Sequence, residues 1–424
     1  MRSGVFAKVL NNALLEIAPS KTELISVESK IKDFREKISN RIKKLHIDAD
    51  VFVGGSFAKR TMIKKRVYDV DVFIRFSKDY KDISELTKKI LGVFSVEEVK
   101  GSRNYFVINM KDFLLEIVPV MKVKNPKNAA NVTDLSYAHV NYIKRKLKGG
   151  KILNEIKLAK AFCYANNCYG AESYIKGFSG YSLELLVYHY GSFLNFLKAF
   201  SNIKLGEKQV IDIEKHFKNK KDVFIDLNES KLKSPVILVD PTYKSRNALA
   251  ALADETFAKF QIICRKFLKT PSINFFRQKT IDIEKIRKES FKKKLDFATL
   301  EIRTDRQSGD IAGSKLLKFY NHLGNEISKY FTIKNRGFGY DSGKTASGFF
   351  SAKKNLEIIS KGPRTDQKES VDAFKKAHKK TFIKSGRIYA TKKINFDLRK
   401  FIDDWKKKNK KQMEEMGMTS IKIL

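Results

Sequence analysis

The feature that most constrains this chain is an alternating segment at residues 68–76, YDVDVFIRF. Apolar side chains recur at every second position, which is the period of a β-strand with one buried face. The other face carries Asp69 and Asp71, so two carboxylates stand roughly 6 to 7 Å apart at the edge of a core. The segment therefore predicts a strand whose apolar face is covered and whose acidic face is available for chemistry.

A Gly-Ser turn precedes this strand in GGSFAKRTMIKKRVYDVDVFI. Two neighbouring carboxylates repel each other, and a divalent cation is a simple remedy, since Mg²⁺ binds through one or two carboxylates plus substrate phosphates. A pair of such ions can clamp both oxygens of a phosphoryl displacement. Ser56 and its adjacent amides precede an expected helix start and would bind a triphosphate. The alternative is an ordinary Asp-x-Asp on an exposed strand face.

The charge of the chain narrows the class of partner. The 424 residues include 86 Lys and Arg against 47 Asp and Glu, a formal net charge of +39. The 42% of hydrophobic residues suffice for several cores, which excludes a disordered chain. Codon usage in an A/T-rich genome would raise Lys, but it would raise Glu as well. The imbalance favours nucleic acid as the partner, over an acidic membrane surface or no polyanion.

The sequence predicts a cytoplasmic protein that does not enter a membrane. No apolar run reaches the roughly 18 residues of a membrane span, and residues 1–20 have the spacing of a helix rather than the apolar core of a signal peptide. Cys163, Cys168 and Cys264 lack the spacing of a zinc site and cannot form a disulfide framework. We expect them to be buried apolar residues in a reducing compartment.

We expect an α+β multidomain fold with three parts. Residues 1–138 should form an N-terminal head, a mixed sheet with helices, in which Pro119 ends the strand that begins at Phe113. Residues 139–276 read as a helical neck and body, with an extended segment at 235–240 and a helix at 246–267. Residues 277–424 alternate between strand and helix patterns, which favours an antiparallel α+β tail with helices on one face of its sheet.

The Gly-Ser turn and the paired aspartates resemble the nucleotidyltransferase superfamily that includes polymerase-beta-like enzymes. The pattern of that superfamily has a third carboxylate on a later strand, and Glu116 in FLLEIVPV fits this place. A carboxylate within an apolar strand needs a partner or a metal. The alternative is an edge-strand glutamate that faces water.

Further motifs narrow the resemblance. The segments AESYIKGFSGYSLELLVYHYGSF, VDPTYKSRNALAALADETFAKF and PSINFF, at residues 171–193, 239–260 and 271–276, resemble the class I, archaeal-type, tRNA CCA-adding nucleotidyltransferases. The resemblance is strong over residues 21–276 and looser in the tail. It implies a head, neck, body and tail architecture and the addition of C, C and A to tRNA 3′ ends from CTP and ATP.

The resemblance also implies roles for individual residues. Three carboxylates correspond to the catalytic metal ligands for two Mg²⁺ ions: Asp69, Asp71 and Glu116. Six residues correspond to nucleotide contacts: Ser56 and Lys59 in the Gly-Ser loop, His139 near the nucleotide, Lys160 and Tyr169 at the phosphates, and Arg246 at the base edge. Lys59 stands where the family often has Arg, and Glu116 stands where Asp is usual. Surface placement is the alternative for Lys59, Lys160, His139 and Arg246, and helix capping is the alternative for Tyr169.

The sequence thus predicts a two-metal nucleotidyltransferase that releases pyrophosphate and binds the acceptor arm of tRNA through shape and phosphates. One alternative is an RNA terminal adenylyltransferase that adds A alone. Another is a non-enzymatic RNA-binding protein on a transferase fold, although all three metal positions are acidic here. The oligomeric state stays open between a monomer and a homodimer.

Overall fold

The computed structural model describes residues 2–65, 67–101, 103–204, 206–278 and 282–424. The chain divides into two compact units, Met1–Lys279 and Thr280–Leu424, each of which is described by itself. Helices and several sheets occur in both, which confirms an α+β multidomain fold. Within the described ranges, none of the helices has the length and hydropathy of a membrane span.

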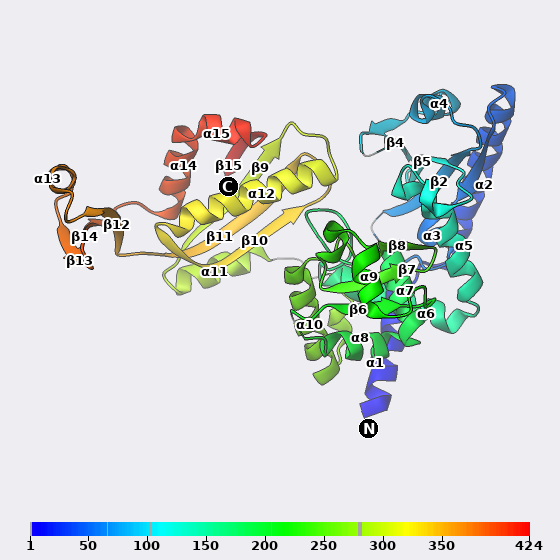
Figure 1. Ribbon diagram of the computed structural model, residues 1–424, viewed down its shortest axis with the longest axis horizontal. Coiled ribbons are helices and arrows are strands. Elements are labelled where there is room, and N and C mark those ends of the chain that lie inside the picture. The colour runs from blue at the N-terminus through cyan, green and yellow to red at the C-terminus, as the bar shows by residue number, and fades with distance from the viewer. Residues whose placement is uncertain (1, 66, 102, 205, 279–281) are drawn as a thin grey trace. The chain divides into compact units, whose positions relative to one another are not determined.

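A five-stranded mixed sheet forms the first part of unit 1 (Figure 1). Its strand order is β1-β2-β5-β4-β3, with β2 parallel to β5 and the other pairs antiparallel. The elements of this part are α1 (Arg2–Ile17), α2 (Lys21–Lys44), β1 (Ala49–Val53), α3 (Gly55–Ala58), β2 (Tyr68–Phe76), α4 (Ile83–Ile90), β3 (Glu97–Val99), β4 (Tyr105–Asn109) and β5 (Phe113–Met121).

Helix α2 covers the apolar side of this sheet. It begins at a capping box in which Ser20 and Glu23 bond to each other's backbone amides. Its buried residues recur at helical spacing and pack with the apolar face of β2: Val27, Ile31, Phe34, Ile38 and Ile42. The alternating pattern of β2 is confirmed, because Tyr68, Val70, Val72, Ile74 and Phe76 are all buried.

The prediction that Pro119 ends its strand is wrong, because β5 continues to Met121. On one side β5 pairs with β2 as far as Met121, whereas on the other side the ladder with β4 stops at Ile117. Pro119 therefore lies where one edge of β5 has no ladder partner. A proline without an N–H group is tolerated at such a position.

The second part of unit 1 is mainly helical. Its elements are two short 3₁₀ helices (Pro126–Asn128 and Val132–Leu135), α5 (Ser136–Lys146), α6 (Gly150–Ala165), α7 (Gly180–Tyr190), α8 (Phe193–Ser201), β6 (Gln209–Asp212), α9 (Lys220–Asp226), a 3₁₀ turn (Glu229–Leu232), β7 (Val236–Asp240), β8 (Tyr243–Asn247), α10 (Asp254–Lys269) and a last 3₁₀ turn (Ile273–Phe275). Phenylalanines from α6, α8 and α10 form the centre of its core, and α1 packs against α6.

A three-stranded sheet, β6-β7-β8, interrupts the helices of this part. The helical prediction for residues 139–276 therefore needs correction here, since only the segment at 235–240 was expected to be extended. The predicted helix at 246–267 also begins too early. Arg246 lies on strand β8, and the helix that follows is α10, which begins at Asp254.

Unit 2 contains two sheets, with strand orders β10-β11-β9-β15 and β12-β14-β13. Its elements are α11 (Ile283–Lys292), β9 (Asp296–Thr304), α12 (Asp310–Ser328), β10 (Phe331–Tyr340), β11 (Thr345–Lys354), β12 (Glu357–Arg364), α13 (Lys368–Ala377), β13 (Thr381–Lys384), β14 (Arg387–Lys393), α14 (Leu398–Lys408), α15 (Lys410–Glu415) and β15 (Met418–Ile423). The pairs within both sheets are antiparallel, as predicted.

The larger sheet of unit 2 has helices on both faces, so the prediction of helices on one face is wrong. The ring of Phe350 on β11 stacks on Tyr320 of α12, with ring centroids 4.7 Å apart. The next residue, Ser351, bonds through Oγ to Ser290 Oγ of α11 at 2.7 Å. Adjacent residues of a strand point to opposite faces, so α11 and α12 cover different sides.

Candidate active site

The three predicted metal ligands lie on neighbouring strands at one cavity. Asp69 and Asp71 are on β2, and Glu116 is directly opposite Asp71 in the parallel ladder with β5. The cavity has a volume of about 310 Å³, and all three carboxylates line it. Four of the predicted nucleotide contacts line it as well: Ser56, Lys59, Lys160 and Tyr169. The structure therefore brings together residues that are up to 113 positions apart, from Ser56 to Tyr169.

The Gly-Ser loop lies directly against Asp71. The amide of Gly54 donates to the backbone carbonyl of Asp71 at 2.9 Å, and α3 begins at Gly55. Gly55 has φ +59°, and a Cβ atom there would lie 1.6 Å from Asp71 Oδ2. Glycine is required at this position by both the backbone conformation and the space. The loop thus places Ser56 beside the carboxylates.

The carboxylate side of the cavity concentrates like charges. Burial, followed by the charges of Asp71 and Asp69, raises the pKa of Glu116 to about 7. Burial also raises the pKa of Asp71, and the neighbouring Asp69 adds to the effect. Asp69 itself is held by Lys65, whose Nζ lies 2.9 Å from Asp69 Oδ2. Burial opposes the charged form of Lys65, but the ion pair with Asp69 outweighs it and raises the pKa of Lys65.

These carboxylates suit a divalent cation whose remaining ligands are waters and substrate phosphates. Among the described residues, no group of three or more His, Cys, Asp or Glu side chains forms a preassembled metal site. Mg²⁺ characteristically takes only one or two carboxylates and completes its shell with waters and substrate phosphates. Burial first, and the neighbouring carboxylates second, raise the pKa values of Asp71 and Glu116, and a bound cation would favour the charged form of both groups. The ion pair with Lys65 engages Oδ2 of Asp69, and a carboxylate has a second oxygen through which it can bind a cation.

Positively charged side chains surround Glu184, a residue that was not assigned to the site from the sequence. This glutamate of α7 is fully buried and accepts from Lys59 Nζ, Lys160 Nζ and Thr61 Oγ1, each at 2.7 Å. Lys160 Nζ also donates to Thr61 Oγ1 at 2.7 Å. The sequence signal is a single carboxylate within the apolar helix segment SLELLV, because such a group needs a partner.

The charges around Glu184 do not cancel. Burial opposes its ionised form, but Lys160 and Lys59 outweigh burial and lower the pKa of Glu184 to about 2. Burial lowers the pKa of Lys160 to about 8, and the nearby Lys59 acts in the same direction, against the attraction of Glu184. Two ammonium groups share one carboxylate, so one positive charge is left over beside Ser56. An anionic group suits this position.

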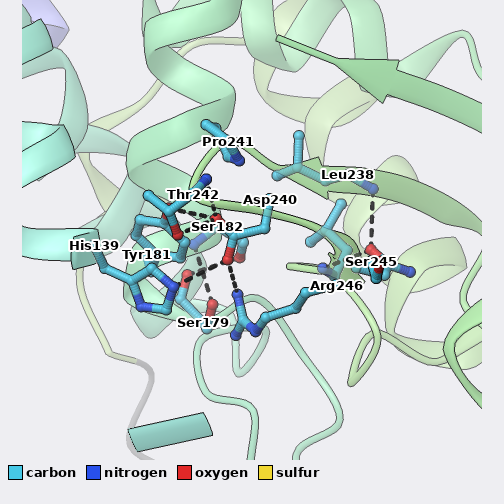
Figure 2. Close-up of polar contacts among 12 residues, drawn as sticks. His139, Ser179, Tyr181, Ser182, Leu238, Asp240, Pro241, Thr242, Ser245 and Arg246 are labelled. Carbon is cyan, nitrogen blue, oxygen red and sulfur yellow. Dashed lines mark hydrogen bonds and ion pairs between the residues drawn. The ribbon is translucent and has the colours of Figure 1, made fainter. Parts of the chain in front are cut away.

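The remaining predicted residues, His139 and Arg246, lie in a second cluster around Asp240 (Figure 2). His139 of α5 contacts Asp240 Oδ2 through Nε2 at 3.0 Å, and Arg246 Nη1 of β8 contacts the same oxygen at 2.7 Å. Tyr181 of α7 donates its hydroxyl to Asp240 Oδ1 at 3.0 Å. Burial lowers the pKa of His139, which favours the neutral imidazole. Neither Asp240 nor Tyr181 was identified from the sequence.

The Tyr181 ring connects the two clusters. It stacks on His139 with ring centroids 4.1 Å apart and an interplanar angle of 25°. Lys59 Nζ lies 6.0 Å from the Tyr181 ring centroid, and Arg246 Cζ lies 5.9 Å from it. Both cations are within cation–π distance of one ring. The Gly-Ser loop, through Lys59, and Arg246 therefore lie near the same ring, although they come from distant parts of unit 1.

Comparison with known proteins supplies family matches over most of the chain. Residues 154–277 match the second domain of tRNA nucleotidyltransferase, and residues 6–146 match the Second Messenger Oligonucleotide or Dinucleotide Synthetase domain. A CCA-adding enzyme of Nanoarchaeum equitans is 35% identical over 345 residues, covering 80% of this chain and 83% of that protein. A CCA-adding enzyme of Methanocaldococcus jannaschii is 28% identical over 401 residues, 90% of this chain and 86% of that protein.

Solved structures show the same fold at low sequence identity. A cytoplasmic RNA terminal U-transferase superposes with a TM-score of 0.50 and 13% identity, covering 65% of this chain and 99% of that one. The Cid1 poly(U) polymerase gives a TM-score of 0.51 and 12% identity, covering 66% of this chain and 100% of that one. These neighbours establish a nucleotidyltransferase fold.

Proposed function

This chain belongs to the family of archaeal-type CCA-adding enzymes, and on that premise we propose that it adds C, C and A in turn to the 3′ end of tRNA. CTP and ATP are the nucleotide donors and pyrophosphate is released. The observation that carries the assignment at residue level is the single cavity lined by Asp69, Asp71 and Glu116 on one side and by Ser56 and Lys160 on the other. A metal-bound nucleoside triphosphate needs groups of both signs.

Enzymes of this family use divalent metal ions, and we assign two Mg²⁺ to Asp69, Asp71 and Glu116. When bound, these ions supply Lewis-acid stabilisation of the tRNA 3′-oxygen and of the departing pyrophosphate. Glu116 acts as a ligand in this scheme and not as the base. No protein nucleophile is required, because the 3′-hydroxyl of tRNA attacks the α-phosphate directly.

The lysine side of the cavity binds the triphosphate. Ser56 and the amides at the start of α3 present hydrogen-bond donors, and Lys59 and Lys160 contribute the surplus positive charge that Glu184 leaves unneutralised. Tyr169 lines the same cavity and is the remaining phosphate contact. These residues position the α-phosphate next to the carboxylates and hold the pyrophosphate as it leaves.

We assign nucleobase recognition to Arg246, with His139 beside the nucleotide. A guanidinium presents several donors in one plane and can satisfy acceptors on cytosine or adenine, which the point charge of a lysine cannot match. Arg246 is close to the phosphate-binding loop through Tyr181, as a residue that contacts the base of the same nucleotide must be.

For the larger substrate we propose that the acceptor arm of tRNA binds through its phosphates and shape. The net charge of +39 supports this, as do the basic runs at 292–294 and 406–411.

We propose the same three parts as before: residues 1–138 as the catalytic head, 139–276 as the neck and body, and 277–424 as the tail. Action on tRNA would place the protein in the cytoplasm. A homodimer stays a prediction.

The function is tested by incubating the full chain with tRNA that ends at the discriminator base, at C or at CC, each with labelled CTP or ATP. The proposal expects CTP incorporation on the first two substrates and ATP incorporation on the third. Incorporation of ATP alone on all three would instead support an RNA terminal adenylyltransferase. Binding of tRNA without any incorporation would support a non-enzymatic RNA-binding protein.

A further inference from the structure

Asp240 is a buried carboxylate on which three elements of unit 1 converge. It lies at the end of β7 with 0% exposure, and both of its oxygens accept hydrogen bonds. Oδ1 accepts from the Tyr181 hydroxyl at 3.0 Å and from the amide and hydroxyl of Thr242 at 2.8 Å each. Oδ2 accepts from His139 and from Arg246. A buried charge is stable only with such partners.

We infer that Asp240 is the positioning residue for the guanidinium of Arg246, and that it thereby determines which nucleobase the enzyme selects. The inference rests on the proposed function, since it assumes that Arg246 reads the base. Asp240 acts through Arg246 and does not itself touch the nucleotide.

The geometry leaves one edge of the Arg246 guanidinium for a ligand. Its Nη1 bonds to Asp240 Oδ2 at 2.7 Å, whereas Nε and Nη2 have no acceptor among the residues that the structure describes. The Arg246 side chain is 22% exposed, while Asp240 is completely enclosed. A planar group fixed at one nitrogen offers its other donors in a defined direction. Donors held in one direction match the acceptor pattern of some base edges and not of others.

The surroundings of Asp240 fix the carboxylate in turn. Thr242 holds Oδ1 through two hydrogen bonds within one tight turn, so the carboxylate does not depend on Arg246 for its own orientation. His139 covers one face of the Tyr181 ring, and Arg246 lies within cation–π distance of the same ring (Figure 2). Because a carboxylate can only accept, the Nε2 atom of His139 carries the proton in this contact.

Nearby residues provide a matched control. Asp226 of α9 accepts from the Ser245 hydroxyl at 2.6 Å and lies 3.8 Å from Lys244 Nζ. Ser245 and Lys244 directly precede Arg246 on β8, but Asp226 does not contact Arg246. Asp226→Asn therefore removes one negative charge next to the same strand without touching the guanidinium.

The experiment measures kcat/KM for CTP, UTP, ATP and GTP on tRNA ending at C and at CC, with the wild type, Asp240→Asn, Arg246→Ala, the double variant and Asp226→Asn. A ratio of two nucleotides does not depend on the fraction of folded enzyme, so a loss of stability does not disturb it. Losing a hydrogen bond to a charged group should reduce the CTP to UTP and ATP to GTP ratios roughly ten- to a hundredfold in Asp240→Asn. Asp226→Asn should leave both ratios unchanged.

The double variant separates positioning from a structural role. If Asp240 acts through Arg246, Asp240→Asn adds no further loss of selectivity in the Arg246→Ala background. Equal losses in both backgrounds would overturn the inference, and so would an unchanged ratio in Asp240→Asn when Arg246→Ala alone loses selectivity. An unchanged ratio in Arg246→Ala would instead overturn base reading by Arg246, which belongs to the proposed function.

Discussion

Replacing Glu184 by glutamine tests the charge balance of the active-site cavity. The carboxylate is fully buried and is shared by Lys59 and Lys160. Glutamine keeps the size of the side chain but leaves two enclosed ammonium groups without this negative partner. Removing one partner of a buried ion pair typically costs about 3 to 5 kcal/mol. At roughly 2 °C for each kcal/mol in a large domain, the Tm of unit 1 should fall by about 6 to 10 °C.

Thermal unfolding of the full chain, followed by circular dichroism, measures this shift. Glu214→Gln is the matched control, because Glu214 also accepts from two donors, Tyr142 and Lys146, but is 30% exposed. A partly exposed pair contributes at most about 1 kcal/mol, so the control should shift Tm by no more than about 2 °C. Equal shifts for the two variants would refute the argument that the burial of Glu184 makes it essential.

The pH dependence of the two proteins gives a second check. In the wild type the pKa of Glu184 is lowered to about 2, so its ionised form stabilises the folded state at pH values above the ordinary glutamate pKa of about 4.3. This contribution to stability is lost as the pH falls from about 4.3 toward 2. Glu184→Gln should lack this acid-sensitive contribution. In the variant, the pKa of Lys160 should fall below its wild-type value of about 8. The variant should then recover stability as the pH rises and Lys160 loses its proton.

Three further results are expected. Gly55→Ala should reduce nucleotide incorporation more than about a hundredfold, because its Cβ would lie 1.6 Å from Asp71 Oδ2; Gly191→Ala, also at positive φ but in open space, should not. Because the pKa of Glu116 is raised to about 7, calorimetry should show weaker Mn²⁺ binding at pH 6 than at pH 8, and equal affinities would contradict this. If about 6 to 10 tRNA phosphates are contacted, filter binding should show affinity falling roughly 10³- to 10⁵-fold between 50 and 200 mM salt, and a flat response would contradict it.

Strand β2 was predictable because its pattern is local. The alternation of residues 68–76 predicts which side chains face the core, and all five alternate positions from Tyr68 to Phe76 are buried, although Phe73 on the opposite face is buried as well. The proximity of Asp71 and Glu116 could not be obtained in this way. It depends on the parallel register of β2 with β5, which pairs residues 45 positions apart, and the family pattern supplied what periodicity could not.

The environment of Arg246 shows where local reasoning fails. The alanines and leucines after Arg246 favour a helix by propensity, and the predicted helix therefore began there. Pairing with β7 determines the actual structure. Asn247 accepts from the amide of Leu238 at 3.0 Å and donates to Ser234 Oγ at 2.8 Å, which ties the end of β8 to its neighbour. Such tertiary contacts override propensity, and no short window of sequence contains them.

The burial of the two predicted lysines is a second feature that the sequence did not reveal. Lys59 and Lys160 were expected to contact phosphate or, alternatively, to lie on the surface of a Lys-rich chain. Their side chains are only 8% and 2% exposed, and Glu184 holds both. The type of residue was visible in the sequence, but the partner that orients it was not. An ion pair across 125 positions, as between Lys59 and Glu184, is created only by folding.

The charges of this protein act at long range through the net charge and at short range inside the cavity. A net charge of +39 attracts tRNA phosphates over long distances, and salt screens this attraction within about 10 Å at 0.1 M. The cavity does not share that sign, because Asp69, Asp71 and Glu116 line it together with the lysines. A general positive field cannot orient a triphosphate against three carboxylates. In the proposed mechanism the paired lysines and the Gly-Ser loop orient the triphosphate, so moderate salt should weaken tRNA binding far more than it slows nucleotide transfer in an already bound complex.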